Sequence, residues 1–151
     1  MRFFSHLILE IKETEMNYWL VKSEPSTYSI DDLKKEKQTF WSGVRNYTAR
    51  NNLKAMAKGD ICIFYHSVKD PAIVGLCKVV KEHYQDPTTD ETAWVVVDVA
   101  FLEKFKKVIP LGEVKNHPKL ANMELLRQSR LSVQKVTQEE FDYIILLANG
   151  K

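Results

Sequence analysis

A chain of 151 residues is long enough for one domain with a substantial core. Its 44% hydrophobic and 28% charged content is typical of a globular protein, and no apolar run is long enough to span a membrane. The net charge of +2 neither requires nor excludes a nucleic-acid partner, because local patches matter more than totals.

Residues 1–15 do not read as a signal peptide, since polar residues interrupt the apolar part and no small-residue cleavage site follows. Lys12-Glu13 would be encoded by a purine-rich sequence a short spacer ahead of Met16, as in a bacterial ribosome-binding site. We therefore expect a translated leader or flexible extension, with Met16 as the natural start. The alternative is a genuine N-terminal element packed by Phe3, Phe4, Leu7 and Ile8.

The next segments are short and have clear boundaries. Residues 18–23 are aromatic and β-branched, which predicts a strand that ends at Glu24-Pro25. Ser29 and Asp32 form a capping box with Asp in place of the usual Glu, opening a helix through about Lys37. A short extended piece over residues 39–41 follows.

Residues 41–53 place an aromatic, a glycine and an arginine directly before a predicted helix. Asn46 is the expected N-cap, and Gly59-Asp60 the stop signal. The helical period predicts a core face of Ala49, Leu53, Met56 and Ala57. A four-residue spacing predicts a positive stripe of Arg50, Lys54 and Lys58.

Three apolar runs, residues 60–67, 72–84 and 93–105, predict consecutive strands of an antiparallel, curled sheet. Gly75 indicates a bulge or a close approach of another backbone. Alternation puts Tyr65 and His66 on opposite faces. Cys62 and Cys77 lie inside these runs and form no CxxC pair, which predicts reduced core thiols in a cytosolic protein.

The C-terminal third predicts a short helix around residues 112–116, one or two helical turns over 118–128 and a strand over 131–136. Thr137 and Glu140 form a regular capping box for a helix that runs to about Ala148. With no repeat or linker, residues 16–151 form one domain.

Four segments together resemble the EVE family, whose eukaryotic members form the thymocyte nuclear protein group. They begin at Tyr18, Trp41, Phe64 and Arg130 and read YWLVKSEP, WSGVRNYTAR, FYHS and RLSVQ. The resemblance covers residues 16 to about 148. It implies an α+β, PUA-like fold, a curled β pseudo-barrel of mostly antiparallel strands with surrounding helices, more distantly similar to the YTH domains.

The resemblance also implies a reader of a modified base, such as a modified cytosine in DNA or RNA, with the flipped base in an aromatic pocket. The residues that the resemblance assigns to this pocket are Lys22, Ser23, Trp41, Ser42, Gly43, Val44, Asn46, Tyr65, His66, Ser67, Leu131 and Ser132. Phosphate contacts are expected from Arg45, Arg50, Lys54, Lys58 and Arg130.

A base pocket needs flat π surfaces and a few polar groups at the base edge. Trp41 and Tyr65 are the expected surfaces, with edge hydrogen bonds from Ser23, Asn46, Ser67 and Ser132. We expect Trp41 to be a pocket wall rather than a core residue, so that its truncation barely affects folding. There are structural alternatives to both predictions. Trp41 could be a core residue before an ordinary amphipathic helix, and the positive stripe could be solvated surface charge.

Two other classes of function stay open. Ser67 or Ser132 could pair with His66 in a small hydrolase, although no nucleophile elbow, metal cluster or phosphate-binding glycine loop is present. A protein-interaction module without a nucleic-acid ligand is the third class. We expect a cytoplasmic, bacterial, monomeric protein that is not an enzyme, with no metal, cofactor or membrane partner.

The leader hypothesis predicts that the protein purified from its native host begins at Met16. Intact-mass measurement tests this directly, and a native species that begins at Met1 would refute it.

Overall fold

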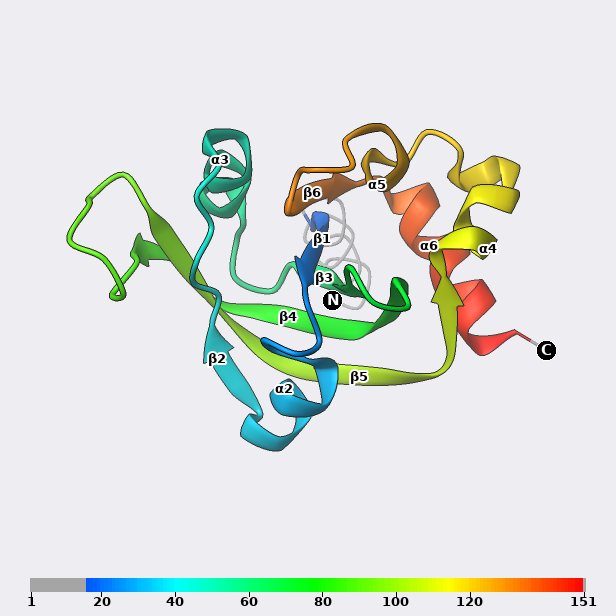
Figure 1. The fold of residues 1–151 in the computed structure, drawn as a ribbon, viewed down its shortest axis with the longest axis horizontal. Coiled ribbons are helices and arrows are strands. Elements are labelled where there is room, and N and C mark those ends of the chain that lie inside the picture. The colour runs from blue at the N-terminus through cyan, green and yellow to red at the C-terminus, as the bar shows by residue number, and fades with distance from the viewer. Residues whose placement is uncertain (1–15, 151) are drawn as a thin grey trace, which may run out of the picture.

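The computed structural model describes residues 16–150, and the predicted leader lies outside them. Six strands and five α-helices, with one 3-10 turn, follow one another along this part of the chain (Figure 1). Their order is β1 (Tyr18–Ser23), α2 (Ile30–Glu36), β2 (Gln38–Phe40), α3 (Tyr47–Ala55), β3 (Ile61–His66), β4 (Ala72–Gln85), β5 (Val95–Pro110), α4 (Leu111–Asn116), η1 (Pro118–Leu120), α5 (Glu124–Arg127), β6 (Val133–Val136) and α6 (Gln138–Asn149).

The strands form one sheet in the order β2-β5-β4-β3-β1-β6. Only β1 and β3 pair in parallel, because the chain between them crosses over through α2, β2 and α3. The expected α+β class and mostly antiparallel pairing are confirmed. Within residues 16–150 the sheet curls but does not close into a barrel, since β2 and β6 remain its two edges (Figure 1).

Both faces of the sheet are covered. Alternate residues of β3 enter different cores, with Phe64 in one and Ile63 in the other. The first core takes Leu33 from α2 and Leu53 from α3, and the second takes residues from α4, α5 and α6. β3 and the first parts of β4 and β5 are therefore mostly apolar, as strand segments buried on both faces are.

Gly75 marks the point where β4 bends. The pairing of β3 with β4 shifts between Phe64 and Tyr65, and that of β4 with β5 between Ile73 and Gly75. A Cβ atom on Gly75 would overlap the carbonyl oxygen of Glu103 and lie 3.0 Å from Cδ1 of Ile30. The predicted close approach of another backbone is confirmed.

The three predicted caps are present. The Ser29–Asp32 and Thr137–Glu140 boxes are reciprocal, and the Asn46 side chain accepts from the backbone N–H of Ala49. Two boundaries were predicted wrongly: β5 extends to Pro110 rather than ending at about Phe105, and α3 ends at Ala55, not at Gly59. The buried Asp60 carboxylate instead accepts the N–H of Ala57 at 2.9 Å, which holds the chain out of the helix. Lys58 is therefore not part of a helical stripe.

Cys62 and Cys77 stand opposite each other on β3 and β4, and both are buried free thiols, as predicted. The neighbouring Cys77 thiol and burial raise the pKa of Cys62. Trp19 is 3% exposed and donates its indole N–H to Asp60. In the described part of the chain, no helix has the length and apolar character needed to cross a membrane.

Gly75→Ala should lower the free energy of unfolding by about 1–3 kcal/mol, because the new methyl group overpacks the contact between β4 and β5. Urea denaturation measures the change. Gly112→Ala is the matched control, since nothing lies within 4 Å of its added Cβ and it sits inside helix α4. That variant should be neutral or slightly stabilising. Equal stability of the two variants would contradict the close approach at Gly75.

Candidate nucleic-acid interface

A cavity of about 330 Å³ opens between the loop that follows β1 and strand β2. Three aromatic residues surround it: Trp41 is 7% exposed, Tyr28 is half-buried and Phe40 is 42% exposed. The rings of Tyr28 and Trp41 are nearly perpendicular, with centroids 6.3 Å apart. The residues that line the cavity are Lys22, Ser23, Thr27, Tyr28, Thr39, Phe40, Trp41 and Ser42.

Trp41 has two roles, not the single one expected. It lines the cavity and also belongs to the first core, where its ring meets Phe64 edge-on at 5.4 Å. Removing a buried Trp side chain typically costs 3–5 kcal/mol. Trp41→Ala would therefore affect folding as well as any ligand, so the more exposed Phe40 is the better position to test.

The polar groups around the cavity are fixed by bonds within the protein. Ser23 Oγ donates to the carbonyl of Tyr28 at 2.7 Å, and Tyr28 donates its hydroxyl to Glu36 at 2.7 Å. Burial and the Glu36 carboxylate raise the pKa of Tyr28. Lys22 Nζ donates to the carbonyl of Ser129 at 2.7 Å, and burial lowers its pKa. The cavity thus offers hydroxyl groups and one ammonium beside its rings.

The buried side chain of Asp86 holds the segment from Trp41 to Asn46. It accepts from the backbone N–H of Gly43 at 3.2 Å, from Arg45 at 3.0 Å and from Thr88. Gly43 has φ +83°, a conformation that glycine adopts without strain. Burial raises the pKa of Asp86, but the hydrogen bonds from Thr88, Arg45 and Gly43 outweigh it and lower the pKa to about 2.

Four of the twelve predicted pocket residues line this cavity: Lys22, Ser23, Trp41 and Ser42. The second expected stacking surface, Tyr65, lies instead in the second core at 4% exposure. Ser67 borders a separate hollow beside Glu24-Pro25.

The other predicted pocket residues support the walls. His66 accepts the backbone N–H of Ile30 through Nε2 at 3.1 Å. Burial lowers the pKa of His66 and so favours this neutral form. Val44 is a core residue, the carbonyl of Ser132 accepts the N–H of Lys22, and Gly43 is held by Asp86.

The predicted phosphate-binding residues fall on two sides of α3. Arg50 donates to the carbonyl of Ala93 and packs on the exposed Tyr47 ring, which in turn stacks on Trp94. Arg45 lies over the other aromatic of this pair, Trp94. Lys54 and Lys58 are exposed. Arg130 lies away from them, beside Asn46.

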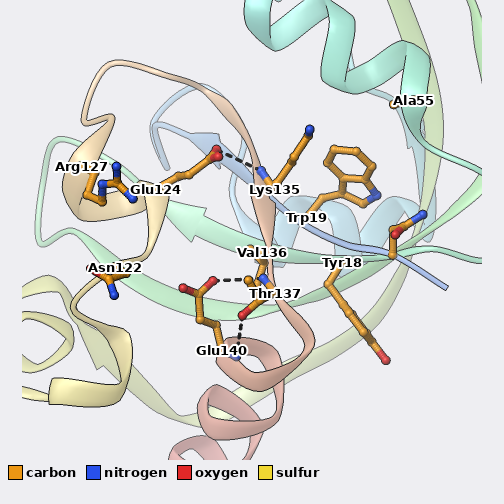
Figure 2. A pocket seen from close by; sticks show the side chains of 11 residues that line it. Tyr18, Trp19, Ala55, Asn122, Glu124, Arg127, Lys135, Val136, Thr137 and Glu140 are labelled. Atoms are coloured by element: carbon orange, nitrogen blue, oxygen red, sulfur yellow. Dashed lines mark hydrogen bonds between the residues drawn. The ribbon is translucent and has the colours of Figure 1, made fainter. Parts of the chain in front are cut away.

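A groove runs along the other side of α3, next to β6. It consists of two hollows, of about 680 and 550 Å³, that share Glu124, Arg127 and Lys135. Figure 2 shows the larger one, where Glu124 binds the main chain of Lys135. Asn46, Arg130 and Leu131, all predicted for the site, line the smaller one.

Sequence reasoning missed Thr27, Tyr28, Thr39 and Phe40 in the cavity, and Asp86 behind it. Phe40 directly precedes Trp41 in a predicted extended piece, so its aromatic character was an available signal. No comparable signal marked Asp86 within a polar loop. Residues 16–150 contain no group of three or more metal-ligating side chains, and no hydrogen bond joins His66 to a serine hydroxyl among them.

The sequence matches the EVE domain family over residues 17–147. Thymocyte nuclear protein 1 of Mus musculus is 45% identical over 165 residues, which cover 87% of this chain and 73% of the mouse protein. The same protein of Gallus gallus is 42% identical over 176 residues, covering 93% of this chain and 73% of the chicken protein.

Several solved structures are also similar to this chain. A hypothetical protein from Leishmania major matches with a TM-score of 0.85 and 42% identity, covering 89% of this chain and 96% of its own. The human THYN1 protein, solved in complex with 5-methylcytosine-containing DNA, matches with a TM-score of 0.83 and 40% identity, covering 89% and 99%. The YTH domain of Zygosaccharomyces rouxii MRB1 shares the fold, with a TM-score of 0.57 and 15% identity over 89% and 87% of the two chains.

The contacts of Asp86 predict acid sensitivity. Its folded-state pKa of about 2 lies below the ordinary value of 3.8, so the charged carboxylate stabilises the fold fully above about pH 4 and loses this effect as the pH falls toward 2. The stabilisation amounts to about 2 kcal/mol. Asp86→Asn should therefore be less stable than the parent at neutral pH by about that amount, with the difference shrinking toward pH 2. Urea denaturation across this range measures it.

Asp90→Asn is the control, because Asp90 is exposed in the same loop and makes no contact with Gly43 or Arg45. A difference between Asp86→Asn and the parent that stays constant with pH would mean that the charge of Asp86 does not stabilise the fold.

Proposed function

Because this chain belongs to the EVE domain family, we propose that it binds nucleic acid and takes a single modified base into the cavity beside Trp41. The observation that carries the proposal is the cavity itself, which has aromatic walls and hydroxyl groups at its rim. Its volume of about 330 Å³ lies at the small end of ligand pockets and suits one base rather than a larger group.

The relatives support a modified cytosine as the ligand. The human protein with 40% identity to this chain was solved with DNA that contains 5-methylcytosine. This chain would use Tyr28, Phe40 and Trp41 as apolar and stacking surfaces, with Ser23, Thr27, Thr39 and Ser42 near the base edge. We propose that the protein binds this ligand as a monomer.

Stacking of the base contributes more to the binding free energy than burial of a methyl group. Base stacking on an aromatic side chain contributes about 1–3 kcal/mol. Burial of one added methyl group contributes only about 0.8 kcal/mol, or roughly fourfold in affinity. Discrimination must therefore also come from a penalty on the unmodified base. Flipping a base out of a duplex costs a few kcal/mol more, so single-stranded nucleic acid is the easier ligand.

The direct test compares two short single-stranded oligonucleotides that differ only in one cytosine or 5-methylcytosine. Fluorescence anisotropy gives both affinities. Tighter binding of the methylated strand supports the proposal, and absence of binding to either strand, or equal binding of both, contradicts it for this base. Nucleosides that co-purify with the protein, identified by mass spectrometry, then show whether another modification is bound.

Phe40→Ala should bind the methylated oligonucleotide at least about fivefold more weakly, because a stacking surface of the cavity is lost. Its melting temperature should change little, since Phe40 is 42% exposed. Leu146→Ala is the control, as Leu146 is 63% exposed on helix α6, outside the cavity. Unimpaired binding by Phe40→Ala would remove this ring from the pocket.

Arg50 and Lys54, two predicted phosphate-binding residues on α3, give a separate prediction. If Arg50 and Lys54 contact phosphates, replacing both with Gln should flatten the slope of log affinity against log salt by about 0.7 per lost contact on single strands. The preference for the methylated base should stay the same, since phosphate contacts carry no sequence information. An unchanged salt slope would identify these two residues as solvated surface charges.

A further inference from the structure

The groove beside β6 carries three cations that form no ion pair within residues 16–150. Arg127, Arg130 and Lys135 line it and are exposed. Within residues 16–150, the ion pairs involve Arg45, Lys104 and His117, and none of these three groove cations. Their side chains also make no hydrogen bond to the described chain, so the groove presents three free positive charges.

The acidic residues of the groove are engaged elsewhere. Glu124 accepts the backbone N–H of Lys135 at 3.2 Å, which covers the open edge of β6. Glu140 is buried and accepts the N–H of Thr137 at 3.0 Å in the capping box of α6. Figure 2 shows both carboxylates turned to the main chain, with the Lys135 ammonium pointing away from Glu124. The free cations are therefore available for an anionic ligand.

The groove and the base cavity are neighbours in the structure. Lys22 lines the cavity, and its ammonium donates to the carbonyl of Ser129, a residue that lines the groove. The segment held by Asp86 also joins them: Trp41 and Ser42, at its start, line the cavity, and Asn46, at its end, lines the groove. The cavity and the groove therefore share a border, formed by the contact of Lys22 with Ser129 and by the segment from Trp41 to Asn46.

We propose that this groove binds the sugar–phosphate backbone on one side of the base held in the cavity. Arg127, Arg130 and Lys135 contact successive phosphates, while the polar side chains of α3, among them Asn46 and Thr48, border the same path. The inference rests on the proposed base-binding function. It adds the side of the cavity on which the strand continues, and it adds two phosphate-binding residues, Arg127 and Lys135, to those predicted in the sequence analysis.

If the path lies on one side of the base, the affinity should depend on where the modified base stands in the oligonucleotide. The strand gains more affinity from nucleotides added on the groove side of the modified base than from those on the other side, where Arg50 is already held by the carbonyl of Ala93 and the ring of Tyr47. Three oligonucleotides of equal length, with 5-methylcytosine at the 5′ end, the centre or the 3′ end, test this by anisotropy. One of the two end-placed strands should bind about as tightly as the centred strand, and the other more weakly. Equal affinity of the two end-placed strands would overturn the proposal.

The double variant Arg127→Gln with Lys135→Gln identifies the residues. Its salt slope on the favoured strand should be shallower by about 0.7 per lost contact. Lys106→Gln with Lys107→Gln removes the same charge from exposed positions on β5 outside the groove and should leave the slope unchanged. Equal slopes for the groove variant and the parent, or equal loss in the control pair, would overturn the proposal.

Base binding in the cavity and phosphate binding in the groove can be tested separately. If the parent protein binds no oligonucleotide, the base-binding function is lost and the groove with it. If the parent prefers the methylated strand but the groove variant keeps both its salt slope and its affinity, only the groove is excluded. If the groove binds phosphate as proposed, the variant loses affinity for methylated and unmethylated strands by the same factor.

Discussion

The site depends on one buried charge. The Asp86 side chain has no exposed surface, and a carboxylate in that position costs several kcal/mol unless hydrogen bonds replace its lost water. Gly43, Arg45 and Thr88 supply four such bonds. These bonds fix a turn at Gly43 that places Trp41 at its start and the cap of α3 after its end. The loop after β4 therefore sets the geometry of residues about forty positions earlier in the chain.

The rest of the fold supports the same segment from behind. Helices cover much of both faces of the sheet. The cavity lies between the loop after β1 and the edge strand β2. His66 at the end of β3 holds the first N–H of α2, which fixes the end of the loop that carries Tyr28. Each wall thus rests on a strand of the central sheet.

Local features of this structure could be predicted from sequence, and non-local ones could not. The caps at Ser29, Asn46 and Thr137 depend on residues three positions apart, so their patterns are visible in the chain. Alternation correctly placed Tyr65 and His66 on opposite faces. It could not tell which face borders the cavity, because both faces are apolar. Phe40 reaches the cavity through the pairing of β2 with β5, a contact between distant segments that no local pattern reveals.

In the proposed function, the cavity and the groove divide the requirements of a reader between them. Stacking and phosphate contacts raise affinity for any strand, because every base has a π face and every nucleotide a phosphate. Only the cavity can distinguish bases, and one methyl group offers it about 0.8 kcal/mol. The rings of Tyr28 and Trp41 are nearly perpendicular and both line the cavity. In the proposed function, selectivity for a modified base arises from the fit of the base at these two rings, while stacking and the phosphate contacts outside the cavity add affinity for any strand.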